Sequence, residues 1–231
     1  MKKILCLSFV SVFGLTAIAT AQTNIVVGGG TSVSLNADVL ESAANLRLSG
    51  ASATATPADG FGGGDGFATV AYNIEPTTTF SYTDGLTSFS GVITHTGTVS
   101  FELGPEFTSE VTFGDFTIGF DDARAVGDAS GFFVQNTLAG DFDGLILFDV
   151  SAPGSIIADS TQLQIAGSDL LVSPELGGFL FDNDFSATNL TGAAVGLAQV
   201  DATAIPEPST YALIFAVGAL AFAFARRRRR S

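Results

Sequence analysis

The 231-residue sequence is poor in the residue types that carry most protein chemistry. It has no tryptophan, one cysteine and one histidine, and its only lysines are Lys2 and Lys3. Cys6 lies in an N-terminal apolar segment, so the rest of the chain cannot form a disulfide, a thiolate metal site or a cysteine nucleophile. The lack of further lysine excludes Schiff-base catalysis, and a single histidine does not make a usual transition-metal cluster.

Positive charge is scarce in the middle of the chain. Of 9 Lys and Arg, two lysines precede residue 22 and five arginines follow residue 205; of 23 Asp and Glu, only Glu207 follows residue 205. The segment 22–205 therefore carries 2 positive and 22 negative charges, a net charge of 2 − 22 = −20. Nucleic-acid binding needs a cationic surface that displaces counterions. We therefore expect no nucleic-acid partner, and an acidic surface that keeps an exported protein soluble.

The N-terminus has the pattern of a secretory signal peptide. Lys2 and Lys3 supply a positive start, residues 4–17 form an apolar segment, and Ala19-Thr20-Ala21 provides small residues at a cleavage position. We predict a signal peptide over residues 1–21, removed by signal peptidase after Sec export. The mature chain would then begin at Gln22, and cleavage two residues earlier, after Ala19, is the alternative.

The C-terminus combines a proline-containing break, an apolar segment and a block of arginines. Tyr211–Ala225 has 15 residues, all apolar except for glycine and tyrosine. As a helix of about 1.5 Å per residue it would be about 22 Å long, less than the hydrocarbon core of about 30 Å. Arg226, Arg227, Arg228, Arg229 and Arg230 are expected to stay cytoplasmic, because positive charge fixes membrane orientation. We predict a short transmembrane helix with a cytoplasmic arginine anchor.

The residues before this helix make the pattern specific. Pro206-Glu207-Pro208, the apolar segment and the arginine cluster together resemble the PEP-CTERM sorting signal of exported bacterial proteins. The resemblance covers the tail, residues 205–231, and implies processing by a membrane enzyme called an exosortase. It also implies a precursor held in the inner membrane and later release to the cell surface or an extracellular matrix. Both prolines disfavour helix, so we expect an exposed, extended peptide at 205–210.

Residues 22–204 are predicted to form one all-β body. Residues 89–103 alternate between apolar or glycine and mainly Thr or Ser positions, the period of a half-buried strand. Further strands are expected at 31–40, 45–56, 67–75, 108–120, 131–138, 145–150, 162–166, 178–181 and 194–202, separated by turn residues, with one helical turn near 122–126. This spacing predicts an antiparallel β-sandwich, jelly-roll-like, with a β-solenoid as the alternative.

Two local features of the body have structural rather than catalytic interpretations. The glycine-rich segment 60–67 precedes a strand and not a helix, so it is expected to be a flexible surface loop and not a phosphate cradle. His95 shares strand parity with Ile93 and Val99, which predicts a buried or rim position. No Gly-x-Ser-x-Gly motif accompanies it.

Carboxylates remain as candidate functional groups. Asp141, Asp143, Asp182 and Asp184 are weak candidate calcium ligands, because calcium prefers hard oxygen donors, although Asp is also common in turns. A carboxylate-dependent extracellular hydrolase is a further alternative, but the chain lacks the tryptophan that usually stacks on sugars. We favour a non-enzymatic structural or adhesive body, with a calcium- or polysaccharide-binding module as the second hypothesis. An extracellular polysaccharide is accordingly a candidate partner, and no cofactor is expected.

Overall fold

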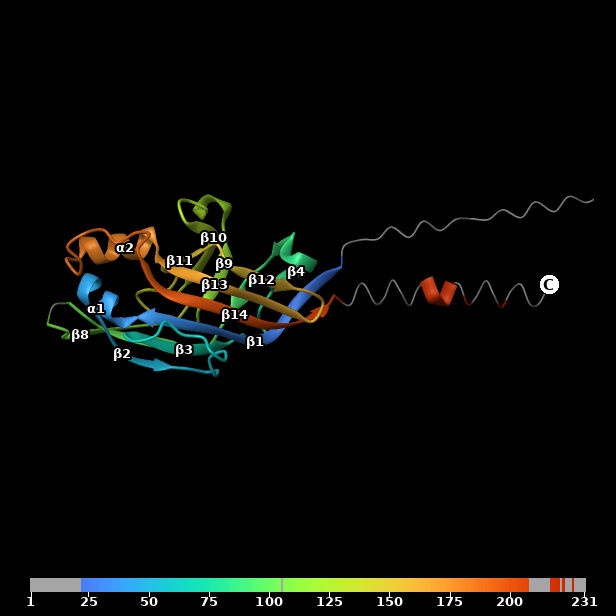
Figure 1. The fold of residues 1–231 in the computed structure, drawn as a ribbon, viewed down its shortest axis with the longest axis horizontal. Helices are drawn as coiled ribbons and strands as arrows, with labels where there is room; N and C mark the ends of the chain where they lie inside the picture. The colour runs from blue at the N-terminus through green and yellow to red at the C-terminus, as the bar shows by residue number, and fades with distance from the viewer. Residues whose placement is uncertain (1–21, 105, 208–216, 221, 223–225, 227–231) are drawn as a thin grey trace, which may run out of the picture.

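The computed structural model describes residues 22–104, 106–207, 217–220, 222 and 226. Most of the body is antiparallel β-structure, which confirms the predicted β-rich fold (Figure 1). The expected signal peptide over residues 1–21 lies outside the described residues.

The larger sheet has 11 strands and curls around a common interior. Its main order is β5-β4-β1-β14-β13-β11-β10-β9-β6, while β3 also pairs with β1 and β12 with β13. The bounds are β1 Thr23–Asn36, β3 Phe67–Asn73, β4 Ser81–Thr83, β5 Phe89–Ser90, β6 Ile93–Thr94, β9 Thr117–Phe120, β10 Ala129–Gln135, β11 Ile146–Ser151, β12 Ser155–Ala158, β13 Gln162–Val172 and β14 Ala194–Pro206.

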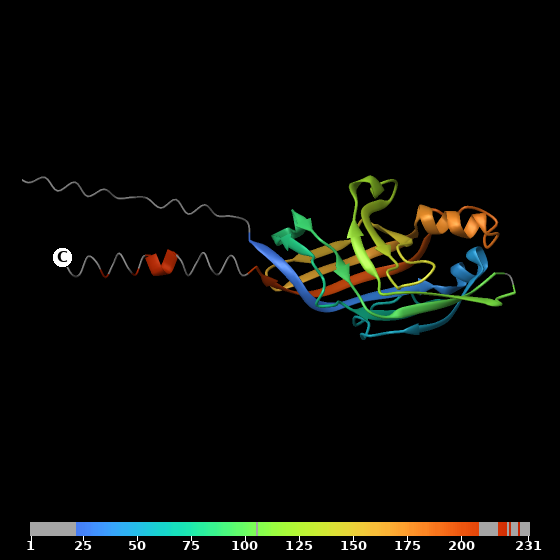
Figure 2. The same cartoon turned by 180° about the vertical axis from the view of Figure 1, so that it is seen from behind.

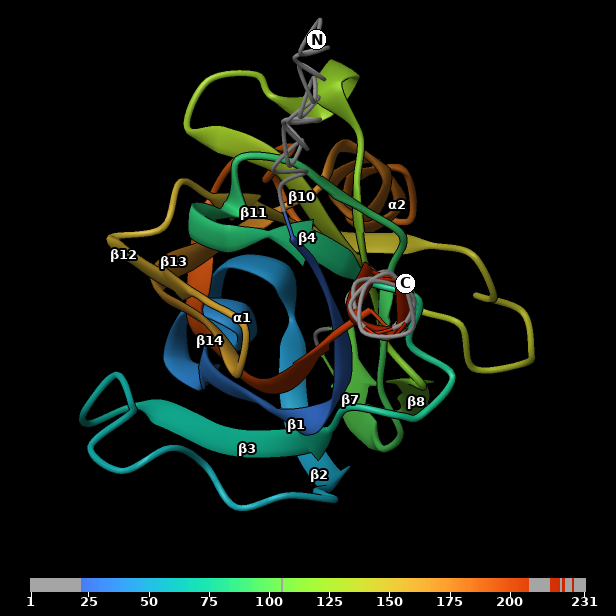
Figure 3. The same cartoon turned by 90° about the vertical axis from the view of Figure 1, so that its right-hand side faces the viewer.

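A smaller sheet of three strands, in the order β2-β7-β8, covers part of the molecule near β3 (Figure 3). Its strands are β2 Leu46–Ser52, β7 Thr98–Leu103 and β8 Ser109–Gly114. The predicted two-sheet sandwich is not confirmed, because the structure shows one large curled sheet with a small partner. Every strand pair among the described residues is antiparallel, unlike the parallel stacking of a β-helix.

The regular alternation of residues 89–103 is divided among three strands in two sheets. Strands β5 and β6 belong to the larger sheet and β7 to the smaller one. Gly91 and Gly97 adopt φ of 83° and 120°, conformations that favour glycine and interrupt the strands. A Cβ on Gly97 would also lie 2.6 Å from the carbonyl oxygen of Ser52, so a side chain does not fit there.

Two α-helices lie at the same end of the body, α1 Ala37–Ala44 and α2 Pro174–Asp182 (Figures 1 and 2). The strand predicted at 31–40 is therefore wrong over its last four residues, and the strand predicted at 178–181 is wrong throughout. The Asn36 side chain accepts a hydrogen bond from the Val39 N–H at 3.1 Å and caps α1. Ser173 caps α2 in the same way, and Pro174 occupies the first turn. The predicted turn near 122–126 is confirmed as the 3₁₀ helix η2, Asp122–Arg124; a second, η1, spans Asp84–Leu86.

The glycine-rich segment forms a loop at the surface, as predicted, with Gly60, Gly62 and Gly64 exposed, and hydrogen bonds attach this part of the chain to β1. The Ala58 N–H donates to Ser32 Oγ at 2.9 Å, and the Gly63 N–H donates to Ser34 Oγ at 3.0 Å. These contacts lay the loop over β1, so Ser32 and Ser34 are buried although they alternate with the inward-facing Val33. The serines on this face satisfy backbone donors of the loop, which a period-two pattern alone does not show.

Within the described part of the chain, the apolar core forms two clusters. One lies near the helices and includes Leu40, Phe101, Leu147 and Leu180. The other lies toward the opposite end of β1 and β14 and includes Val26, Phe80, Tyr82, Leu163 and Ala204. The last residue of the second cluster along the chain is Ala204, three residues before the described part of the body ends at Glu207.

Candidate functional site

The tail leaves the body directly from an edge of the packed structure. Strand β14 continues through Ile205 and Pro206, which pair with Ile25 and Asn24 of β1. The Glu207 N–H then donates to the Thr23 carbonyl oxygen at 2.9 Å. The start of β1 and the end of β14 thus lie side by side, away from α1 and α2 (Figures 1 and 2). The first two residues of the predicted tail segment therefore belong to the sheet.

The described part of the predicted sorting peptide is extended, as expected. Ile205 is 45% exposed although it sits in a strand, and Pro206 and Glu207 are partly exposed. Pro208 lies outside the described residues. Pro206 has no N–H, but its position at the strand end means that no ladder hydrogen bond is lost inside the sheet.

Beyond residue 207 the structure describes only residues 217–220, 222 and 226, and each of these is helical. They include Arg226, whereas Arg227–Arg230 lie outside the described part. Most of the predicted transmembrane helix over 211–225 also falls outside it. Where the chain is described, no helix has the length and apolar character to cross a membrane.

His95 lies between β6 and β7 in the chain and is buried, as its strand parity predicted, with 2% of its surface exposed. Its Nδ1 lies 3.0 Å from the Phe116 carbonyl oxygen and its Nε2 lies 2.7 Å from Thr31 Oγ1. Since a carbonyl only accepts, Nδ1 carries the proton and Nε2 accepts from the Thr31 hydroxyl. Both ring nitrogens are used within the fold, and burial lowers the pKa of His95 to about 4.

This lowered pKa predicts a loss of stability on mild acidification. The folded state keeps His95 neutral, whereas the unfolded state takes up a proton below its ordinary pKa of 6.5. The stabilisation is present above pH 6.5 and is lost as pH falls toward 4. Between pH 7 and pH 5 we expect the free energy of unfolding to fall by about 2 kcal/mol from this residue alone. Urea titrations at pH 7 and pH 5 measure this free energy of unfolding. His95→Gln, which does not titrate, should show a smaller drop, and an equal drop would contradict the assignment.

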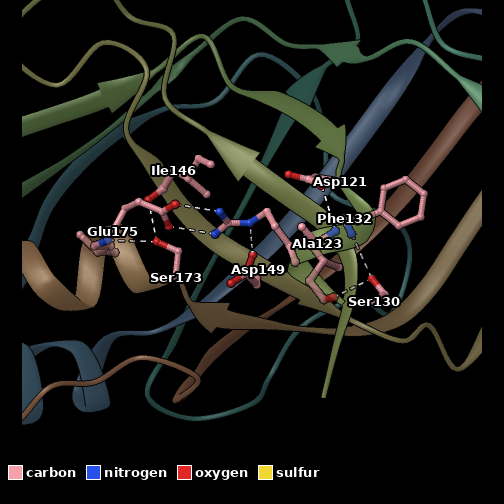
Figure 4. Close-up of polar contacts among 11 residues, drawn as sticks. Asp121, Ala123, Ser130, Phe132, Ile146, Asp149, Ser173 and Glu175 are labelled. Atoms are coloured by element: carbon pink, nitrogen blue, oxygen red, sulfur yellow. Dashed lines mark hydrogen bonds and ion pairs between the residues drawn. The ribbon is translucent and has the colours of Figure 1, made fainter. Parts of the chain in front are cut away.

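A second polar cluster, formed by the hydrogen bonds of Arg124, joins η2, β11 and α2. Its partners Asp149 and Glu175 are shown in Figure 4. Arg124 Nε donates to Asp149 Oδ1 at 2.7 Å, and its two terminal nitrogens donate to the two Glu175 carboxylate oxygens at 2.7 and 2.9 Å. The Arg124 and Asp149 side chains are only 13% and 11% exposed. The bonds to Arg124 hold the pKa of Glu175 below its ordinary value, and the bonds to Glu175, followed by those to Asp149, raise that of Arg124.

The backbone supports this cluster on both sides. Asp121 Oδ1 accepts from the Ala123 N–H at 2.9 Å and starts the turn that carries Arg124. Ser173 Oγ donates to the Ile146 carbonyl oxygen at 2.7 Å and accepts from the Leu176 N–H, which fixes the start of α2 beside β11 (Figure 4). The arrangement ties three elements together with paired charges. The sequence analysis did not predict this role. Arg124 is one of only two positively charged residues in the acidic segment 22–205, and this rarity was a signal for a paired charge.

The four candidate calcium ligands lie in two turns. Asp141 and Asp143 occupy the turn between β10 and β11, while Asp182 ends α2 and Asp184 follows it with φ of 59°. The two turns are linked by aromatic packing, because the Phe142 ring lies 5.2 Å from the Phe179 ring of α2. Within the described residues, no three His, Cys, Asp or Glu side chains gather as a set that could hold a metal ion.

The comparisons with known proteins concern the tail alone. Residues 204–230 match the family model of the PEP-CTERM protein-sorting motif. No curated protein and no solved structure matches the chain. The match contains Pro206, Glu207 and Pro208, the apolar segment and Arg226–Arg230, the same parts on which the sequence resemblance rests. The C-terminal tail of this chain therefore carries a PEP-CTERM protein-sorting motif.

Proposed function

We propose that this chain is an exported bacterial surface or extracellular-matrix protein. It is retained in the inner membrane by its tail and processed there by an exosortase, after Sec export and removal of residues 1–21. The body acts as a structural or adhesive module without catalysis. The PEP-CTERM motif at 204–230 supports the sorting part of this proposal, because such motifs imply exosortase-dependent delivery to the cell surface.

The observation that carries the proposal is the place where the motif joins the body. Ala204, a member of the second core cluster, is 4% exposed, and the next residue, Ile205, is 45% exposed. The motif thus begins at the last buried residue of the described body, and its residues Ile205 and Pro206 still pair with β1. Cleavage after Pro206 or Glu207 would leave both core clusters and almost the whole β1–β14 ladder intact. The released body would keep its fold.

The use of polar groups inside the body supports a non-enzymatic role. Both nitrogens of His95 are occupied by Thr31 and Phe116, and the bonds to Arg124 use Asp149 and Glu175. A general base needs a free nitrogen or carboxylate within reach of substrate. These groups instead hold strands and helices together.

Mass spectrometry of fractionated cells tests the proposal. We expect the surface or matrix fraction to contain a form that begins at Gln22 and ends within or next to Pro206–Pro208. The inner-membrane fraction should contain a precursor that still includes Phe222–Ser231. A surface form that retains Phe222–Ser231 would contradict tail processing and would leave an uncleaved tail anchor.

A further inference from the structure

The two core clusters enclose a space between them. A cavity of about 90 Å³ lies in the interior, several times the volume that one water molecule needs. Its walls come from both clusters and both sheets, and are formed mainly by aliphatic and phenylalanine side chains, such as Ile93, Phe101, Leu147, Leu170 and Val200. Apolar walls with few polar groups are typical of sites for small molecules.

Five polar side chains also line this cavity: Thr31, Tyr72, His95, Ser151 and Ser168. The Tyr72 hydroxyl donates to the Thr98 carbonyl oxygen at 3.3 Å. Thr31 and His95 bond to one another, and Ser151 Oγ accepts from the Asp169 N–H at 2.7 Å. Ser168 differs from these, because its Oγ has no hydrogen-bond partner although the residue is only 2% exposed. A buried hydroxyl without a partner is costly, so a retained one calls for a ligand or water.

A bulge in β13 directs Ser168 into the cavity. The pairing of β13 with β14 shifts register between Ile165 and Ser168, and Gly167 adopts φ of 71°. Ile165, Ser168 and Leu170 all line the cavity, although regular alternation would place Ile165 and Leu170 on opposite faces. The extra residue therefore resets the parity so that the Ser168 side chain lies on the inner face of β13, as that of Leu170 does. Bulges often serve to re-aim a side chain in this way.

The lining also defines the charge of a suitable ligand. None of the described side chains that line the cavity is a Lys, Arg, Asp or Glu. His95 is neutral at physiological pH, because burial lowers its pKa to about 4. An ionised ligand would lose its hydration without gaining a paired charge. A neutral molecule with a single polar group matches the walls and the free hydroxyl.

We propose that this cavity binds a small neutral molecule that is apolar over most of its surface and carries one hydroxyl or carbonyl oxygen, which hydrogen-bonds to Ser168. This site is independent of the tail, since its residues all precede Ala204. It gives the body a binding activity beyond a structural or adhesive role.

Cyclopentanol and cyclopentane, which differ by one hydroxyl group, test the site. The full chain is placed in lipid nanodiscs with labelled Ile, Leu and Val methyl groups, and each compound is titrated by NMR at constant lipid. We expect cyclopentanol to shift the methyl signals of Ile93, Leu147 and Val200, but not that of the exposed Ile156. Ser168→Ala should weaken cyclopentanol binding about fivefold, the loss of one hydrogen bond, and change cyclopentane binding less than twofold.

A second pair of variants tests the cavity itself. Ala198 lines it, so Ala198→Leu should occupy the space and abolish binding of both compounds. Ala194→Leu makes the same substitution at an exposed position of β14 and should bind like the unaltered chain. Absent shifts at Ile93, Leu147 and Val200 would overturn the proposal, as would equal cyclopentanol affinity in Ser168→Ala. If Ala198→Leu fails to fold, the Ser168→Ala comparison decides the matter alone.

Discussion

Arg124→Ala is expected to lower the free energy of unfolding by about 3 kcal/mol. The substitution removes the partner of two carboxylates at once, and the Asp149 side chain is only 11% exposed. Breaking a buried ion pair from one side costs about 3–5 kcal/mol, because the remaining charge is left without compensation. Glu175 is 39% exposed and is solvated after the change, which places the expected loss at the lower end of that range.

Arg47→Ala is the matched control for this prediction. Arg47 also pairs with a carboxylate, Glu102, but the two side chains are 45% and 34% exposed. Exposed ion pairs contribute about 0–1 kcal/mol, so this variant should change the unfolding free energy by less than about 1 kcal/mol. Denaturant unfolding of the processed chain measures both. Equal effects of the two substitutions would contradict a special role of the Arg124 cluster.

A double-mutant cycle separates the Arg124–Asp149 interaction from the loss of side-chain packing. Arg124 also lies over the Phe133 ring, with 5.6 Å between the guanidinium carbon and the ring centre. If the pair dominates, Asp149→Asn should recover part of the stability lost in Arg124→Ala, because it removes the unpaired charge. If packing against Phe133 dominates, Asp149→Asn should give no recovery.

The sequence predicted the β-rich body well because strand periodicity is a local signal. Strands β3, β11 and β14 begin within a residue of their predicted positions. The helix α2 was missed because its residues 178–181 include two phenylalanines, which also suit a strand. Its start signals, Ser173 as the cap and Pro174 in the first turn, were present in the sequence.

The arrangement of the strands was less predictable, because it depends on contacts between distant segments. Strand β1 pairs with β14, about 170 residues away in sequence, and also with β3 and β4. The division of residues 89–103 between two sheets depends on Gly91 and Gly97, whose close approaches to Thr79 and Ser52 appear only in three dimensions. A periodic pattern records which residues share a face and not which sheet they join.

The candidate sites also differ in how far the sequence alone predicts them. The sorting motif was predictable because it is a linear pattern of prolines, apolar residues and arginines in fixed order. The Ser168 cavity was not, because it depends on a bulge at Gly167 and on walls from both sheets. His95 lies between these cases: parity predicted its burial, while its partners Thr31 and Phe116 come from distant segments.

Replacing Pro206, Glu207 and Pro208 with alanine is expected to reduce the processed surface form at least tenfold and to leave full-length precursor in the inner membrane. The tail, with its apolar segment and Arg226–Arg230, is unchanged, so retention and orientation should persist. The body should remain folded, because Ala204 is the last core residue and the motif begins at its edge. Immunoblots of membrane and surface fractions measure the two forms.

A control variant in the body and a second variant in the tail show which residues each effect depends on. Pro76→Ala removes an exposed proline from the turn after β3 and should be processed like the unaltered chain. Serine in place of Arg226–Arg230 keeps the motif but removes the charge that holds the tail on the cytoplasmic side, so we expect unprocessed, misoriented chain. Normal processing of the alanine variant would show that the motif is not the recognition element. Normal processing of the serine variant would instead show that the apolar segment alone orients the tail.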